Sequence, residues 1–142
     1  MLRKFKLEDL DDFIPQKEQC IGSEWDKRVW IHSYLIGCEM YTAEDAQGVI
    51  GFCSFVPDAF GNETFCIVFS DRKRAAAREM ILLYDLVFMN RPIKRTQAFV
   101  KRGWGDAARF ATHFCFKHEG TLKNFGRDGE DYDVYAIVRG AK

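Results

Sequence analysis

The stretch TFCIVFSDRKRAAAREMILLYDLVFMN, residues 64–90, decides the fold, because a buried strand runs directly into an amphipathic helix within it. The run from Phe65 to Phe69 is apolar, β-branched and aromatic, which is typical of a buried strand. Ser70 and Asp71 follow it, and both are good helix N-cap residues. From Asp71 to Asn90 apolar side chains recur at helical spacing. We expect one face to carry Ala76, Met80, Leu83 and Val87, flanked by Ala77, Ile81, Tyr84 and Phe88.

Three cations occupy the first turn of this predicted helix: Arg72, Lys73 and Arg74. Cations at a helix N-terminus oppose the helix dipole and cost about 0.3–1 kcal/mol each. Backbone N–H groups beside three cations suit an anion the size of a phosphate. The alternative interpretation is a solvated basic turn whose charge Asp71 partly offsets.

Composition limits the classes of protein that this chain can belong to. Its 142 residues suffice for one domain with a hydrophobic core, and the 47 % hydrophobic content excludes a disordered chain. The 21 basic residues are balanced by 21 acidic ones, which argues against general attraction to nucleic acid or anionic membranes. There is no apolar run of transmembrane length and no signal peptide, so we expect a cytoplasmic protein without a membrane partner.

The five cysteines give no sign of a disulfide framework or a metal site. Their number is odd, and no two of them form a C-x-x-C pair. We therefore expect five reduced thiols and no bound metal.

Shorter elements flank the decisive stretch on both sides. A mobile connection is expected at 16–24, after a helix that Pro15 disrupts. This order of elements predicts an α/β or α+β fold, a single domain over residues 1–142. The expected strands are 2–6, 38–43, 48–57, 93–101, 114–122 and 132–139, and the expected helices are 7–14, 25–37 and 103–114.

This order resembles the GCN5-related N-acetyltransferase (GNAT) superfamily over essentially the whole chain. LRKFKLEDLDDF is similar to the family's opening strand and acidic helix, AQGVIGFCSF to its hairpin, and FKHEG to its closing strand. The resemblance implies a single mixed, mostly antiparallel sheet flanked by about four helices. It also implies that the sheet splays between the strand ending near Phe69 and the strand starting near Ile93.

The resemblance further implies an acyl-CoA-dependent N-acyltransferase that uses acetyl-CoA and transfers the acyl group directly to an amine. Backbone N–H groups of Ile67, Val68 and Phe69 would hold pantetheine and polarise the thioester carbonyl. The family's pyrophosphate signature, Q/R-x-x-G-x-G/A, falls on six residues here, with alanine in place of the middle glycine. They are Arg72, Lys73, Arg74, Ala75, Ala76 and Ala77.

Glu63 resembles the position at which many members of the family keep a carboxylate base. The alternative is a solvent-exposed acid in the turn after Asn62. The family's tyrosine acid, which protonates the leaving thiolate, is replaced by Ala111, and the asparagine at the start of the closing helix by Trp104.

Two other functions stay open. The departures at Ala75 and Ala111 resemble small GNAT-like proteins of T7-type phages, so a catalytically inactive protein in the host cytoplasm or a virion is the main alternative. Nucleic-acid binding through the basic pairs at 94–95 and 101–102 is a third, against which the zero net charge argues. The acceptor amine could be a small molecule, a protein N-terminus or a lysine, and the protein a monomer or a homodimer.

Overall fold

The structure is a computed structural model of the chain, and it describes residues 1–19, 39–83 and 90–140. The helix expected at 25–37 lies outside these residues. Contacts divide the chain into two compact units. The first comprises Met1–Pro57 and Cys66–Arg91, and the second comprises Asp58–Phe65 and Pro92–Lys142.

Seven strands pair in the order β1-β2-β3-β4-β5-β7-β6, and β4–β5 is a parallel pair in an otherwise antiparallel set of registers. This mixed sheet confirms the α+β class. The strands are β1 Leu2–Lys4, β2 Glu39–Asp45, β3 Gly48–Pro57, β4 Glu63–Phe69, β5 Arg95–Lys101, β6 Lys117–Leu122 and β7 Tyr132–Val138. The described helices are α2 Ala77–Leu83 and α3 Gly105–His113, with short 3-10 helices η1 Leu7–Leu10, η2 Lys17–Gln19 and η3 Lys73–Ala76.

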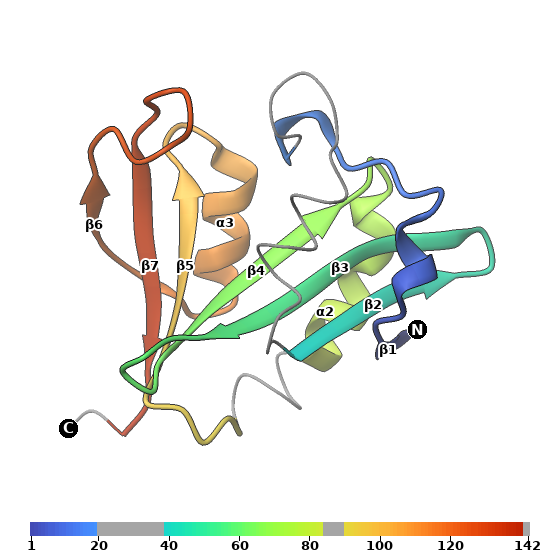
Figure 1. Cartoon of the computed structure of the whole chain (residues 1–142), viewed down its shortest axis with the longest axis horizontal. Helices are drawn as coiled ribbons and strands as arrows, with labels where there is room; N and C mark the ends of the chain where they lie inside the picture. The colour runs from blue at the N-terminus through green and yellow to red at the C-terminus, as the bar shows by residue number, and fades with distance from the viewer. Residues whose placement is uncertain (20–38, 84–89, 141–142) are drawn as a thin grey trace. The chain divides into compact units, whose positions relative to one another are not determined.

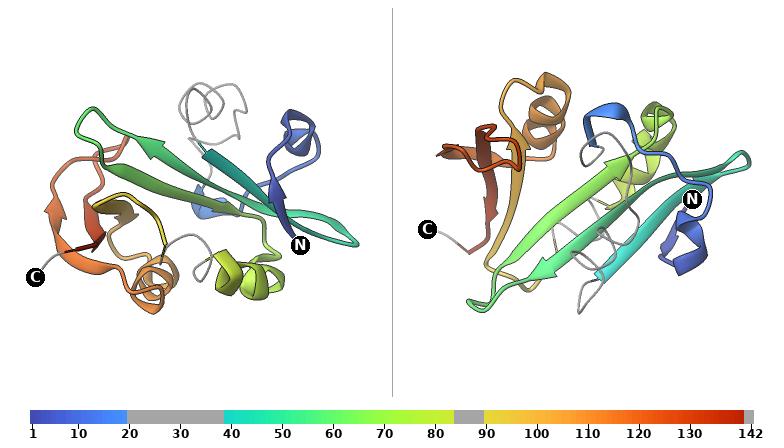
Figure 2. Two further views of the ribbon diagram at one scale, coloured as in Figure 1. Left: turned by 90° about the horizontal axis from the view of Figure 1, so that it is seen from below. Right: turned by 45° about the horizontal axis from the view of Figure 1, so that its top comes forward.

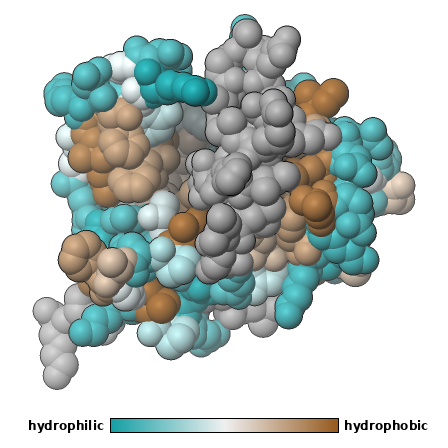
Figure 3. All heavy atoms as spheres, viewed as in Figure 1, coloured by the Kyte–Doolittle hydropathy of each residue, from teal (hydrophilic) through white to brown (hydrophobic). Residues whose placement is uncertain are grey.

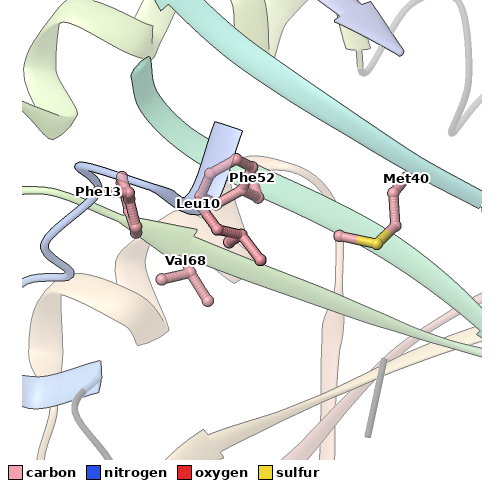
Figure 4. Close-up of a cluster of buried hydrophobic side chains, with 5 residues drawn as sticks. All are labelled: Leu10, Phe13, Met40, Phe52 and Val68. Atoms are coloured by element: carbon pink, nitrogen blue, oxygen red, sulfur yellow. The ribbon is translucent and has the colours of Figure 1, made fainter. Parts of the chain in front are cut away.

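The first unit is built on the predicted hairpin. β2 and β3 pair from Glu39 opposite Phe55 to Asp45 opposite Gly48, and η3 and α2 lie against one face of these strands (Figure 2). A cluster of five buried side chains forms the core of the unit, with the edge of the Phe13 ring against Phe52 (Figure 4). Its members are Leu10, Phe13, Met40, Phe52 and Val68.

The second unit holds β5, β7 and β6, with α3 packed beside β5 (Figure 1). β4 joins β5 through only two described register pairs, Glu63 with Thr96 and Thr64 with Gln97. The Phe125 ring packs against Phe99 in a tilted arrangement and edge-on against Tyr132, and Phe125 stays 50 % exposed. Apolar atoms gather on the surface of this unit in the view of Figure 3.

Two predictions near the N-terminus are wrong in detail. The helix expected at 7–14 is only the single turn η1, at whose start the Asp9 carboxylate accepts the Lys6 N–H at 2.9 Å. Ile14 is 77 % exposed. The connection expected to be mobile at 16–24 is fixed in its described part, since Gln16 is only 4 % exposed and η2 follows it.

The α-helix expected at 71–90 starts later than predicted, and a more tightly wound 3-10 helix precedes it. Ser70 Oγ accepts the Arg72 N–H at 3.2 Å, and the 3-10 helix η3 precedes α2. Ala76 and Met80 are buried as expected, but Ile81 is 53 % exposed. Residues 84–89 of the expected helix lie outside the described residues.

Strand β6 begins at Lys117, three residues later than predicted. Cys115 has φ 66°, in the left-handed region, so the chain reverses direction between α3 and β6. The extended conformation is therefore possible only after this reversal.

Candidate functional site

Glu63 is a buried carboxylate, so its interpretation as a solvent-exposed turn acid is wrong. Only 3 % of the residue is exposed, at the start of β4. Thr96 Oγ1 donates a hydrogen bond of 2.7 Å to Glu63 Oε2 from the neighbouring position on β5. A buried carboxylate needs such donors, because burial without them disfavours the charged form strongly.

Arg139 extends this contact into a network within the second unit. Its Nη1 donates a hydrogen bond of 2.8 Å to Thr96 Oγ1 and another of 3.0 Å to the backbone oxygen of Ile93. The Thr96 hydroxyl thus accepts from a cation and donates to Glu63. This chain of donors fixes the direction in which the Thr96 hydroxyl points and leaves Glu63 as the acceptor at its end.

The C-terminal half of β4, in the first unit, presents two backbone edges with different partners. Ser70 donates its N–H to Ile50 of β3 at 2.9 Å. Because peptide groups alternate between the two edges of a strand, Ile67 and Phe69 direct theirs to the edge away from β3. This is the edge that the family resemblance gives to pantetheine.

That edge is occupied by two glutamines, which we call the glutamine clamp: Gln16 and Gln19. Gln19 Oε1 accepts the Phe69 N–H at 2.7 Å, and Gln19 Nε2 donates to the Ile67 carbonyl at 2.6 Å. The Gln16 N–H donates 2.7 Å to the Phe69 carbonyl. The predicted binding group Phe69 N–H therefore already has a partner within the protein, and so does the Ile67 carbonyl.

The clamp is connected to the basic turn. Gln16 Nε2 donates 2.8 Å to Gln19 Oε1, and Lys73 Nζ donates 3.1 Å to Gln16 Oε1. Lys73 thus holds the Gln16 carboxamide in the orientation that supports Gln19.

The basic turn, predicted as an anion site or as a solvated turn offset by Asp71, is partly paired within the protein. Arg72 pairs with Asp45 at the end of β2, and this hydrogen bond lowers the pKa of the Asp45 carboxyl. Arg74 is exposed. Two of the turn's N–H groups are satisfied internally, because Arg72 N–H donates to Ser70 Oγ and Ala75 N–H donates 2.9 Å to the Arg72 carbonyl.

The alanines of the signature differ in exposure. Ala75 is exposed and Ala76 is fully buried, while Ala77 begins α2. A methyl group at 75 therefore faces the surroundings, where a ligand would approach. Glu63 belongs to the second unit and residues 67–77 to the first, so the predicted site residues divide between the two.

At Gly51, strand β3 lies very close to the end of β4. A Cβ added there would lie 2.4 Å from the Val68 carbonyl oxygen and 2.8 Å from Cδ1 of Phe69. Only glycine allows this spacing, which fixes the backbone at Val68 and Phe69.

Ala111, at the position of the family's tyrosine acid, carries no catalytic group. Ala111 is buried in α3, and its carbonyl accepts the Phe116 N–H at 3.0 Å. Within the described ranges, no three His, Cys, Asp or Glu side chains converge on a possible metal site, and no helix is long and apolar enough to span a bilayer.

Comparison with solved structures identifies the architecture. An N-acetyltransferase from Staphylococcus aureus Mu50 superposes with a TM-score of 0.75 at 19 % identity, covering 97 % of each chain. The chain has the GNAT fold. A ribosomal-protein-alanine N-acetyltransferase from Brucella melitensis matches the GNAT fold of this chain with a TM-score of 0.70 and 17 % identity, over 97 % of this chain and 99 % of that one. A variant of the spermidine N-acetyltransferase SpeG from Vibrio cholerae gives 0.67 and 17 %, over 97 % and 92 %.

Sequence comparison alone does not reach these proteins. No family model matches the sequence, and no curated protein sequence matches it either. The GNAT fold has thus been kept here at a level of identity below 20 %.

Proposed function

We propose that the protein is an N-acyltransferase that moves an acyl group, in the first instance acetyl, from acyl-CoA to an amine. The observation that carries the proposal is a buried carboxylate, Glu63, fixed by Thr96 at the start of β4 in a GNAT fold. Solved structures of similar fold include enzymes named for a polyamine and for a protein N-terminal alanine, which are both amine acceptors.

The reaction needs few protein groups. The amine nitrogen attacks the thioester carbonyl carbon, a C–N bond forms, the C–S bond breaks, and the sulfur leaves as thiolate. In this proposal Glu63 accepts the proton that the nitrogen loses, either directly or through water. Because position 111 is alanine, the thiolate takes its proton from water, and Glu63 returns the proton it accepted to solvent.

The cosubstrate would contact two parts of the first unit. Backbone groups of Ile67 and Phe69, on the edge of β4 away from β3, would bind pantetheine. The residues at the pyrophosphate would be Arg72, Lys73, Arg74, Ala75, Ala76 and Ala77. Charge-assisted hydrogen bonds from Arg72 and Arg74 suit a phosphate oxygen. The exposed Ala75 methyl limits close approach of the backbone, so Ala75→Gly should tighten binding.

The test measures binding first and turnover second. Calorimetry with CoA and acetyl-CoA should detect a complex with the wild-type protein that weakens with salt. Turnover is then followed as CoA release, with spermidine and an alanine-terminated peptide as probe amines. Glu63→Gln should lower turnover by ~10²-fold or more while leaving the Kd for CoA nearly unchanged.

Glu8→Gln is the matched control, since Glu8 is exposed on η1. Equal turnover in Glu63→Gln and Glu8→Gln would remove Glu63 from the mechanism. Absence of CoA binding in both the wild type and Ala75→Gly would overturn the acyltransferase proposal.

The second candidate is a GNAT-like protein without catalysis, such as a phage protein that binds a partner or packs in a virion. Ala75 and Ala111 favour it, together with the Asp45 carboxylate already paired with Arg72. The calorimetry separates the two candidates, because only the enzyme requires CoA to bind.

A further inference from the structure

The glutamine clamp has the hydrogen-bonding pattern of a bound ligand. Gln19 offers one carboxamide, whose oxygen accepts from Phe69 N–H and whose nitrogen donates to the Ile67 carbonyl. A secondary amide of an extended molecule laid along this edge would offer the same acceptor and donor. The pantetheine arm of CoA carries such amides.

We propose that the Gln19 carboxamide stands in for a pantetheine amide, and that acyl-CoA binds by displacing it from the edge of β4. The inference rests on the proposed function for the identity of the ligand. It adds that Gln19, a residue outside the family's signature, sets the affinity for the cosubstrate.

The clamp is a built feature of the first unit. Gln16 is only 4 % exposed, and its backbone N–H and its side chain both take part, through Phe69 and Gln19. Exposed surface glutamines have no such set of short contacts on a strand edge. The edge is therefore covered in the ligand-free chain, which leaves no backbone polar group of Phe69 unsatisfied there.

Lys73 couples the clamp to the basic turn. Its ammonium donates to Gln16 Oε1 at 3.1 Å, and Gln16 in turn donates to Gln19. A phosphate that draws Lys73 away removes one support of the Gln16 carboxamide. Binding of the nucleotide half of CoA therefore loosens Gln19 before the pantetheine arm takes its place.

The experiment compares Gln19→Met with wild type by calorimetry. Methionine keeps the length and volume of glutamine but offers no strong hydrogen bond. The Kd for CoA should fall by about tenfold, because the ligand no longer competes with two internal hydrogen bonds. The Kd for the nucleotide half of CoA, ribose-phosphorylated ADP without pantetheine, should fall by a smaller factor, because it competes with the clamp only through Lys73 and Gln16.

Gln47→Ala is the control, a glutamine change at an exposed position of the β2–β3 turn that should leave both Kd values unchanged. Hydrogen exchange gives a second readout on the wild-type protein. CoA should speed exchange of the Gln16 amide, because loss of the Gln19 and Lys73 contacts loosens the segment that holds it, while the Phe69 amide stays protected by the pantetheine amide.

Each result of these measurements supports or contradicts one of the two proposals. Equal Kd values for CoA in wild type and Gln19→Met, with the Gln16 amide still protected, would overturn the clamp proposal and leave the acyltransferase proposal standing. CoA binding to both proteins, with a Kd about tenfold lower in Gln19→Met, would support the clamp directly. Failure of CoA to bind either protein, with both folded by thermal melting, would overturn both proposals.

Discussion

Replacing Gly51 by alanine tests the spacing between β3 and the end of β4. The added Cβ would meet the Val68 carbonyl oxygen at 2.4 Å, Cδ1 of Phe69 at 2.8 Å and Cα of Phe69 at 3.3 Å. Two of these three atoms belong to the backbone, so rotating a side chain cannot remove the clash. The strands must move apart by about 1 Å to restore ordinary contact distances of about 3.5 Å.

The expected cost is about 2–3 kcal/mol of unfolding free energy, the usual range for overpacking in a well-packed region. For a chain of 142 residues this corresponds to a fall in Tm of about 7–10 °C. Urea unfolding followed by circular dichroism gives the free energy, and a thermal melt gives the Tm.

Gly120→Ala is the matched control, because an added Cβ on this β6 residue meets no atom within 4 Å. It should change the unfolding free energy by less than about 0.5 kcal/mol. If Gly51→Ala were as stable as Gly120→Ala, the close approach between Gly51 and Val68 would be refuted.

Two further predictions concern titratable groups. Burial opposes ionisation of Asp9, but hydrogen bonds from Arg3, the Lys6 N–H and Thr42 outweigh it and lower the Asp9 pKa below its ordinary 3.8. The stability that this carboxylate contributes is therefore present above about pH 4 and is lost as pH falls through the folded pKa. Urea unfolding between pH 5 and pH 2 should therefore show a shallower pH dependence in Asp9→Asn than in wild type. Burial raises the pKa of Cys53 to about 12, whereas Cys115 is exposed. Iodoacetamide at pH 8 should modify Cys115 in the native protein and spare Cys53, while mass spectrometry after unfolding and alkylation should find all five cysteines modified.

The order of the strands along the chain and the position of α3 could be predicted, because the apolar pattern that marks each element lies within its own segment. β2, β3, β4, β5 and β7 each lie within about two residues of the range expected from apolar alternation and flanking turn residues. A boundary was wrong where one backbone conformation decides it, as at Cys115 before β6.

The environment of Glu63 could not be predicted from its neighbours. Asn62 and the turn before it suggest exposure, whereas burial depends on Thr96, 33 residues further along the chain. Ile81 shows the opposite error, since helical spacing places it near the apolar face but 53 % of it is exposed. Periodicity gives the direction of a side chain and does not give the elements that cover it.

The glutamine clamp was missed for a similar reason. Gln16 and Gln19 lie in a polar segment without periodicity, and their partners Ile67 and Phe69 follow 48 to 53 positions later. Two amide residues three positions apart after a proline are a possible signal, but only when a strand with an unpaired edge is already known.

Because Arg72 is paired with Asp45, an anion can bind Arg72 only by displacing the Asp45 carboxylate. Asp45 is a competitor that the chain itself supplies, tethered at an effective concentration on the order of millimolar. An incoming anion must outcompete this carboxylate at Arg72, so a singly charged ion such as acetate gains little there at millimolar levels. A polyphosphate that reaches Lys73 and Arg74 as well contacts cations that Asp45 does not neutralise. On the proposed function, the turn would therefore favour anions with several charges over small ones.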